Sequence, residues 1–157
     1  MKNWLKFVLC IIGVELVGIL SSFLSLGSLD IWYSSLIRPS FNPPSWIFGP
    51  VWTILYAVIG ASLYFFMMSK GKNKDKKTAY WIFGIQIFLN FIWSPIFFGM
   101  HNIFLAVIVI ALLWLAIIFT FLAFYKISKT SAWLLVPYWF WVSFASILNF
   151  SLWMLNR

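Results

Sequence analysis

Five long apolar runs, separated by short polar segments, dominate the chain. Each run has at least the roughly 20 residues that a helix needs to cross a hydrocarbon core of ~30 Å. The runs are continuous rather than alternating, and open backbone cannot face lipid, so the pattern predicts helices and argues against a β-barrel. The predicted spans are Leu5–Leu26, Trp46–Ser69, Thr78–Phe98, Asn102–Tyr125 and Ala132–Leu155.

The connections between these spans are short, with one exception. Lys70–Lys77 is a basic loop, Gly99–His101 a tight turn, and Lys126–Ser131 a polar turn in which Ser131 is the expected N-cap of the last helix. Only Gly27–Ser45 is long. Short connections make neighbouring helices antiparallel, so residues 1–157 are predicted to form one all-α domain, an integral membrane bundle of five transmembrane helices.

The end of the long first loop is stiff and aromatic. The stretch RPSFNPPSWIFGPVWTILY, from Arg38 to Tyr56, contains four prolines, which fix the backbone in an extended form. Pro43 or Pro44 is expected in the first turn of the following helix. The preceding piece DIWYSSLI, from Asp30 to Ile37, is a candidate short interfacial helix. A rigid aromatic loop that leads directly into a span suggests that something is held beneath it.

Composition and charge place the chain in a membrane and give it an orientation. Hydrophobic residues make up 64% and charged residues 9%, whereas soluble domains have about 25% charged residues. The end with the N-terminus carries nine lysines and the other carries Arg38 and Arg157, which predicts a cytoplasmic N-terminus and an external C-terminus. We interpret the lysines as a topology signal near anionic lipid, and not as a nucleic-acid surface. They are Lys2, Lys6, Lys70, Lys72, Lys74, Lys76, Lys77, Lys126 and Lys129.

Glu15 is an acidic residue near the middle of the first span. An ionisable group at that depth is expensive and is therefore a functional candidate. The alternative is a neutral carboxyl hydrogen-bonded to a neighbouring helix, since burial disfavours the charged form. The spans contain no second acid or lysine to build an ion relay, which argues against an ion-coupled pump.

Aromatic and amide side chains recur on single faces of three predicted helices. Simple interhelical packing explains such faces, and amides often join helices by hydrogen bonds. The same pattern also suits a flat apolar ligand, with aromatic walls, small side chains for space and a few polar groups. The three faces are Trp52 and Tyr56; Asn90, Trp93 and Phe97; and Trp141, Ala145 and Asn149.

The remaining inventory offers little ordinary chemistry. Pro95 and Pro137 are expected to bend their helices or free a carbonyl. Cys10 is expected to pack inside its span, and His101 is either solvated or an axial ligand for haem iron. The sequence has no Ser-His-acid set, paired carboxylates, phosphate-binding glycine loop or metal-binding cluster. Tryptophan, with 11 residues, is the one unusual reactive component.

Four segments carry a resemblance to a known family. They are WYSSLIRPSFNPP (Trp32–Pro44), FGPVWTILY (Phe48–Tyr56), LNFIWSPIFFGMHN (Leu89–Asn102) and VPYWFWVSFASILNF (Val136–Phe150). On these motifs the chain resembles a bacterial-type member of the TspO/MBR family, the tryptophan-rich sensory proteins and translocator proteins, once called peripheral-type benzodiazepine receptors.

The resemblance implies a membrane bundle, often a homodimer, in which the first loop closes over an internal pocket. It implies binding of protoporphyrin IX or haem, and of isoquinoline carboxamide or benzodiazepine drugs, without a required cofactor or metal. It also implies the cell membrane of a bacterium as the location. The ligand-binding positions carried over by motif are Trp32, Tyr33, Pro43, Trp52, Tyr56, Asn90, Trp93, Trp141 and Ala145.

Three functions follow from the resemblance. The first is a binding protein that affects the transport, disposal or signalling of a tetrapyrrole. The second is a light-dependent porphyrin-degrading enzyme, because the two tryptophans that such family members require correspond to Trp52 and Trp141. The third is a lipid or sterol translocator. Sterol binding is not expected, because Phe150 and Met154 stand where animal members have a tyrosine and an arginine.

Overall fold

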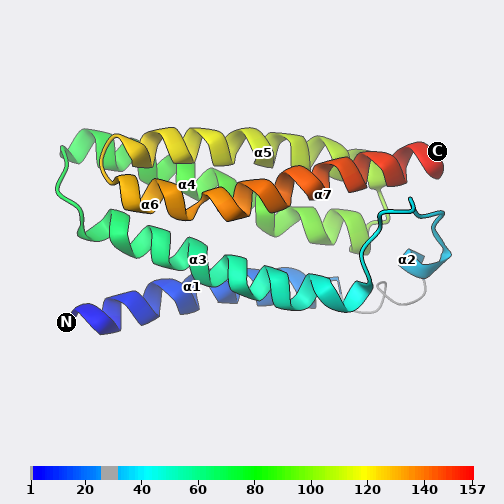
Figure 1. Ribbon diagram of the computed structural model, residues 1–157, viewed down its shortest axis with the longest axis horizontal. Coiled ribbons are helices and arrows are strands. Elements are labelled where there is room, and N and C mark those ends of the chain that lie inside the picture. Colours follow the sequence, from blue (N-terminus) through cyan, green and yellow to red (C-terminus); the bar gives the residue numbers. More distant parts are fainter. Residues whose placement is uncertain (1, 26–31) are drawn as a thin grey trace.

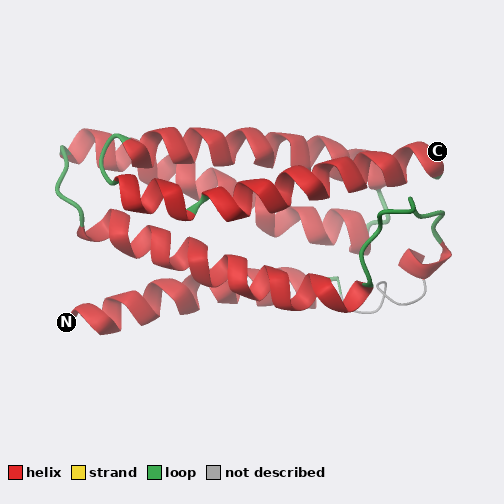
Figure 2. Ribbon diagram, viewed as in Figure 1, coloured by secondary structure: helices red, strands yellow, loops and turns green. Residues whose placement is uncertain are grey.

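A computed structural model describes residues 2–25 and 32–157 of the chain, and within those ranges it contains helices and loops and no strand (Figure 2). Five helical segments there are long and apolar enough to span a membrane, which confirms the predicted all-α bundle. Asp30 and the expected end of the first span at Leu26 lie outside the described residues. The elements are α1 (Asn3–Phe23), α2 (Trp32–Ser35), η1 (Ser45–Ile47), α3 (Phe48–Met68), α4 (Asn73–Ser94), η2 (Pro95–Gly99), α5 (Ile103–Tyr125), α6 (Lys129–Leu134) and α7 (Val136–Leu155).

The spans run antiparallel, as their short connections predict, and α5 packs against α4, α6 and α7 while α1 packs against α3 (Figure 1). Glycine permits the close approach of α1 to α3. A Cβ atom on Gly60 would lie 2.6 Å from the Cα of Ile11, and one on Gly18 would overlap the ring of Tyr56. Since backbone atoms of two helices almost touch at Gly60, only glycine fits there.

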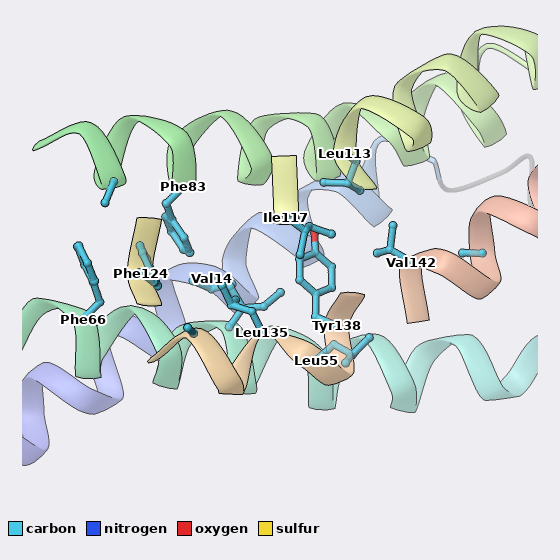
Figure 3. Close-up of a cluster of buried hydrophobic side chains, with 14 of the residues drawn as sticks. Val14, Leu55, Phe66, Phe83, Leu113, Ile117, Phe124, Leu135, Tyr138 and Val142 are labelled. Carbon is cyan, nitrogen blue, oxygen red and sulfur yellow. The ribbon is translucent and has the colours of Figure 1, made fainter. Parts of the chain in front are cut away.

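The core lies between the helices and is rich in aromatic rings (Figure 3). Phe66 and Phe124 stack with their ring centroids 4.0 Å apart, and Phe83 stacks on the other side of Phe124 at 5.7 Å. Phe66, Phe124 and Tyr138 are fully buried. Such packing, rather than burial from water, holds helices together in lipid.

Buried hydroxyl and indole groups add hydrogen bonds between the helices. Ser62 of α3 donates to the carbonyl of Ser131 in α6 at 2.7 Å. The indole of Trp114 in α5 donates to the hydroxyl of Ser143 in α7, also at 2.7 Å. These bonds fix how far each helix is rotated about its own axis, which decides the residues that face the interior.

Helix boundaries depart from the prediction at two places on the lysine-rich end. The expected loop Lys70–Lys77 is largely helical, because α4 begins at Asn73. Lysine tolerates a helix well, and the Lys76 amine here donates to the carbonyls of Met67 and Ser69 at the end of α3. The last span begins earlier too: its N-cap is Ser128, whose hydroxyl accepts from the amide of Ser131, so the prediction of Ser131 as N-cap was wrong.

The prolines alter their helices as expected. At Pro95 the helix widens into a π-turn, in which the amide of Met100 donates to the Pro95 carbonyl at 2.8 Å. Before Pro137 the last span is interrupted at Leu135, between α6 and α7. Pro44 precedes η1 as its N-cap with ψ 138°, so the prediction that Pro43 or Pro44 occupies the first helical turn was wrong.

Candidate functional site

The aromatic face of α3 is formed by Trp52 and Tyr56, one turn apart. Their rings stack with centroids 5.4 Å apart and planes inclined by 29°, as their spacing of four residues predicts. Tyr138 of α7 meets the Trp52 ring edge-on at 6.4 Å. The α3 face therefore points at α7.

A chain of buried polar groups crosses the bundle beside these rings. The Tyr56 hydroxyl donates to Oδ1 of Asn90 at 2.7 Å, and Nδ2 of Asn90 donates to the Tyr138 hydroxyl at 2.9 Å. The Tyr138 hydroxyl in turn donates to Oε1 of Gln86 at 3.1 Å. Asn90 thus ties α3, α4 and α7 together, which confirms its expected position facing protein rather than lipid.

Sequence reasoning missed two members of this chain, Tyr138 and Gln86. Gln86 precedes Asn90 by four residues, and Tyr138 precedes Trp141 by three, so each lies on a helix face that had already been identified. The polar character of Gln86 in an otherwise apolar run was a signal that went unused.

Trp93 extends the α4 face toward the first loop. Its indole donates to Oδ1 of Asn149 in α7 at 3.0 Å, and its ring stacks on Phe97 at 5.4 Å. Ala145, four residues before Asn149 on α7, is buried with little side-chain bulk. The structure therefore brings together the α4 and α7 faces that their periodicity indicates.

Trp141 lies on the α7 side of the same region. Its ring meets the ring of Phe48 edge-on at 6.1 Å. Phe48 belongs to α3 and precedes Trp52 by one turn. Phe144 lies 5.5 Å away in α7. Trp52 and Trp141 thus come from two helices whose aromatic side chains meet.

Four buried donors have no hydrogen-bond partner among residues 2–25 and 32–157, and two of them lie among these rings. These two are Nε1 of Trp141 and Nδ2 of Asn149, and the others are Nε2 of Gln86 and Nε1 of Trp139. A buried donor without a partner costs about 1–3 kcal/mol. A ligand with acceptor groups would remove that cost.

The helices that carry these side chains separate at one end. α3 packs against α6 but makes few contacts with α7. Figure 1 shows α3 and α7 diverging toward the end of the bundle that holds the C-terminus. The rings of Trp52, Trp141 and Phe48 lie at this divergence, so side chains rather than backbone contacts bridge it.

The first loop covers this end of the bundle, and Trp32 and Tyr33 of α2 anchor it. Both rings pack edge-on against Phe97, at 5.5 and 6.2 Å. The buried Tyr33 hydroxyl donates to Oδ1 of Asn42 at 2.7 Å. Burial raises the pKa of Tyr33, and the Asn42 hydrogen bond and the Arg38 charge offset part of that rise.

The middle of the loop is held by a residue near the C-terminus. Asn156 accepts from the amide of Ile37 and donates to its carbonyl, both at 2.9 Å. Phe41 meets Phe144 edge-on at 6.4 Å. Pro43 is half-buried, and its carbonyl accepts from the Asn42 amide at 3.0 Å, so it joins the loop rather than the ring cluster.

Two other candidates lie beside residues of this region: His101 beside Trp32, and Glu15 within range of an electrostatic interaction with Tyr56. His101, with φ 53°, stacks on Trp32 at 4.5 Å, so its ring helps to anchor α2. Glu15 is half-buried and makes no hydrogen bond or ion pair with any residue in 2–25 or 32–157, so the expected bond to a neighbouring helix is not found. Within the same ranges no group of three His, Cys, Asp or Glu side chains gathers as a metal site.

Comparison with known proteins agrees with this architecture. The sequence model of the TspO/MBR family matches residues 9–154. The chain is 41% identical to a tryptophan-rich protein TspO of Chlorobaculum tepidum, over 99% of this chain and 98% of that protein. It is 41% identical to one of Archaeoglobus fulgidus, over 98% and 99%. It is 33% identical to the translocator protein of Sus scrofa, over 98% and 92%.

Proposed function

Because this integral membrane protein belongs to the TspO/MBR family, we propose that it binds a flat tetrapyrrole, protoporphyrin IX or haem, between α3, α4 and α7 beneath the first loop. The observation that carries the proposal is the pair of unpartnered donors, Nε1 of Trp141 and Nδ2 of Asn149, among aromatic rings. Rings and sparse donors match a planar apolar ligand that has a few acceptor atoms.

The residues have separate parts in this proposal. Trp52, Tyr56 and Trp141 stack against the macrocycle, while Ala145 leaves space for it. Asn90 and Trp93 keep the walls in place through their bonds to Tyr138 and Asn149. Trp32, Tyr33 and Pro43 close the loop above. Isoquinoline carboxamide drugs would compete for the same rings, and the bound tetrapyrrole would be held for transport, disposal or regulation.

The test is a titration of purified protein with protoporphyrin IX, followed by tryptophan quenching and the porphyrin absorption band. We expect saturable binding at about one porphyrin per chain, weakened by roughly tenfold when Trp52→Phe and Trp141→Phe are combined. The smaller rings cover less of the macrocycle, and Trp141→Phe also removes the Nε1 donor, whose hydrogen bond contributes about 0.5–1.5 kcal/mol. Asn90→Ala should also weaken it.

The matched control is Trp4→Phe with Trp133→Phe, which removes two tryptophans that are 63% and 60% exposed. This control should leave the affinity unchanged. Non-saturable uptake that is equal in all variants would show that the porphyrin only partitions into detergent, and would overturn the proposal.

A second candidate function is light-dependent oxidation of the bound porphyrin by dioxygen. It is favoured by the position of Trp52 and Trp141, whose helices meet through Tyr138 and Phe48. Under aerobic light, bleaching should be faster with the protein than with empty micelles, and the variant carrying Trp52→Phe and Trp141→Phe should lose that excess. Equal bleaching with and without protein would exclude this function.

We also propose the cell membrane as the location, with the N-terminus in the cytoplasm. The distribution of lysine supports this orientation. Assembly as a homodimer is a further expectation from the family, and light scattering of the purified protein tests it.

A further inference from the structure

Two hollows lie toward the lysine-rich end of the bundle, which is opposite the end covered by the first loop. One, of about 430 Å³, is bordered by the start of α4: Asn73, Lys76, Lys77, Tyr80 and Trp81. The other, of about 440 Å³, lies between α1, α3 and α4. Its lining is apolar apart from Lys6 and Cys10, and it includes Leu9, Val17 and Ile87.

A hydrogen bond at the end of α3 links the linings of the two hollows. Met67 lines the second hollow, and its carbonyl accepts from the amine of Lys76, which lines the first, at 3.0 Å. The thiol of Cys10, also in the second hollow, lies 3.9 Å from the Met67 sulfur. A polar recess at the start of α4 therefore neighbours an apolar groove along the bundle.

Positive charge gathers at this end of the molecule, and Lys76 and Lys77 line the recess itself. Nine lysines stand at this end of the molecule, and Asp75 is the one acid there. Throughout residues 2–25 and 32–157, neither Lys6 nor Lys77 has a hydrogen-bond or ion-pair partner. The Lys77 ammonium lines the recess, and the Lys6 ammonium lines the neighbouring groove.

The groove below the recess is open and has the features of a lipid-facing surface. A Cβ atom on Gly13 would meet nothing within 4 Å. At the level of the recess, Trp81 is 66% exposed and Tyr80 is 37% exposed. Aromatic residues with a polar tip favour the headgroup region of a bilayer, so the recess lies at headgroup depth and the groove at acyl-chain depth.

We propose that this composite surface binds one anionic phospholipid from the leaflet at the N-terminal end. Its phosphate occupies the recess beside Lys77, and one acyl chain lies in the groove past Lys6 and Gly13. The charge of the recess matches a phosphate, the lining of the groove matches a hydrocarbon chain, and the volumes fall in the range of roughly 300–1,000 Å³ that is usual for ligand sites. The lipid site is independent of the proposed tetrapyrrole site.

The headgroup half is tested by native mass spectrometry of detergent-purified protein equilibrated with phosphatidylglycerol or with phosphatidylcholine of the same chains. Lys6→Gln combined with Lys77→Gln should weaken the binding of phosphatidylglycerol by roughly 10- to 30-fold. The binding of phosphatidylcholine should not change. The matched control, Lys126→Gln with Lys129→Gln, removes the same charge from the same end outside both hollows. An equal loss in the control would show a diffuse attraction and overturn the proposal.

The acyl-chain half is tested with Gly13→Leu, which fills the groove. This substitution should weaken the binding of both lipids by roughly tenfold, which is the effect of displacing about two methylene groups of the acyl chain. Gly84→Leu is the control, because Gly84 also has open space around it but lines neither hollow. Unchanged lipid binding in the Gly13→Leu variant would overturn the proposal. If that variant instead turned a dimer into a monomer by light scattering, the groove would be a contact between two copies, and the proposal would fail in that way.

Discussion

Asn90 joins three helices through one side chain. Its amide accepts from Tyr56 of α3 and donates to Tyr138 of α7, and the residue is only 4% exposed. Water does not reach groups at this depth, so a hydroxyl that loses its partner here has no replacement. The position therefore has structural importance whether or not a ligand binds beside it.

We expect Asn90→Leu to lower the free energy of unfolding by about 1–2 kcal/mol, because it leaves the Tyr56 hydroxyl without its acceptor and removes one of the two hydrogen bonds of the Tyr138 hydroxyl. Thermal unfolding of the purified protein in detergent measures the loss. Ser151→Ala is the control, since that hydroxyl donates only to the Ile147 carbonyl of its own helix. Equal stability of the two variants would show that the hydrogen bonds of Asn90 do not hold the three helices together.

Sequence spacing located part of this site and missed the rest for a physical reason. The i, i+3 and i, i+4 rules place Asn90 with Trp93, and Trp52 with Tyr56, because those pairs share one helix. Tyr138 is paired with Asn90 only through the rotation of α7 about its axis. That rotation is decided by packing between helices, which spacing within one helix does not reveal.

At the scale of whole helices, α1 and α3 are held together by close backbone approach. Gly60 faces the backbone of Ile11 and Cys10, which no rotamer change can move aside. Gly84 of α4, in contrast, has open space where a Cβ atom would stand. Two glycines in membrane helices therefore have opposite tolerance for a side chain.

Gly60→Ala should destabilise the protein by about 1–3 kcal/mol through overpacking. Gly84→Ala should be neutral or stabilising by up to about 1 kcal/mol, because alanine favours a helix more than glycine does. Chemical unfolding in mixed micelles, followed by circular dichroism, ranks the two variants. Equal tolerance of alanine at both positions would mean that α1 and α3 do not approach as closely as described.

The helices themselves were largely predictable, and their ends were not. Each apolar run had to become a helix, because its backbone groups have no other partner in lipid. The start of α4 at Asn73 was missed because charged residues were assigned to a loop, although Lys76 stabilises the end of α3 from inside the helix. The break at Leu135 follows from Pro137, but the sequence did not show at which residue the helix would be interrupted.

For the molecule as a whole, charge is divided between the two ends. The nine lysines belong to the end where α1 begins, where α3 meets α4 and where α5 meets α6, and Arg38 and Arg157 lie at the other (Figure 1). Positive charge is retained on the cytoplasmic side during insertion. The distribution of charge therefore predicts a preferred direction of the bundle in the membrane.

Thiol labelling of intact cells tests this direction in a chain whose only cysteine is removed by Cys10→Ser. A membrane-impermeant reagent should label an Arg157→Cys variant and leave a Lys72→Cys variant unlabelled until the cells are broken. The reverse pattern would place the lysine-rich end outside. Labelling of both variants in intact cells would point to a mixed orientation.

The bonds between Asn156 and Ile37 have a practical consequence for handling the protein. They tie the loop to the penultimate residue of the sequence, so an affinity tag fused after Arg157 begins one residue from this attachment. Such a tag, or the loss of the last two residues, would loosen the loop without altering any ring beneath it. A tag at the amino terminus begins at the opposite end of the bundle and leaves the attachment intact.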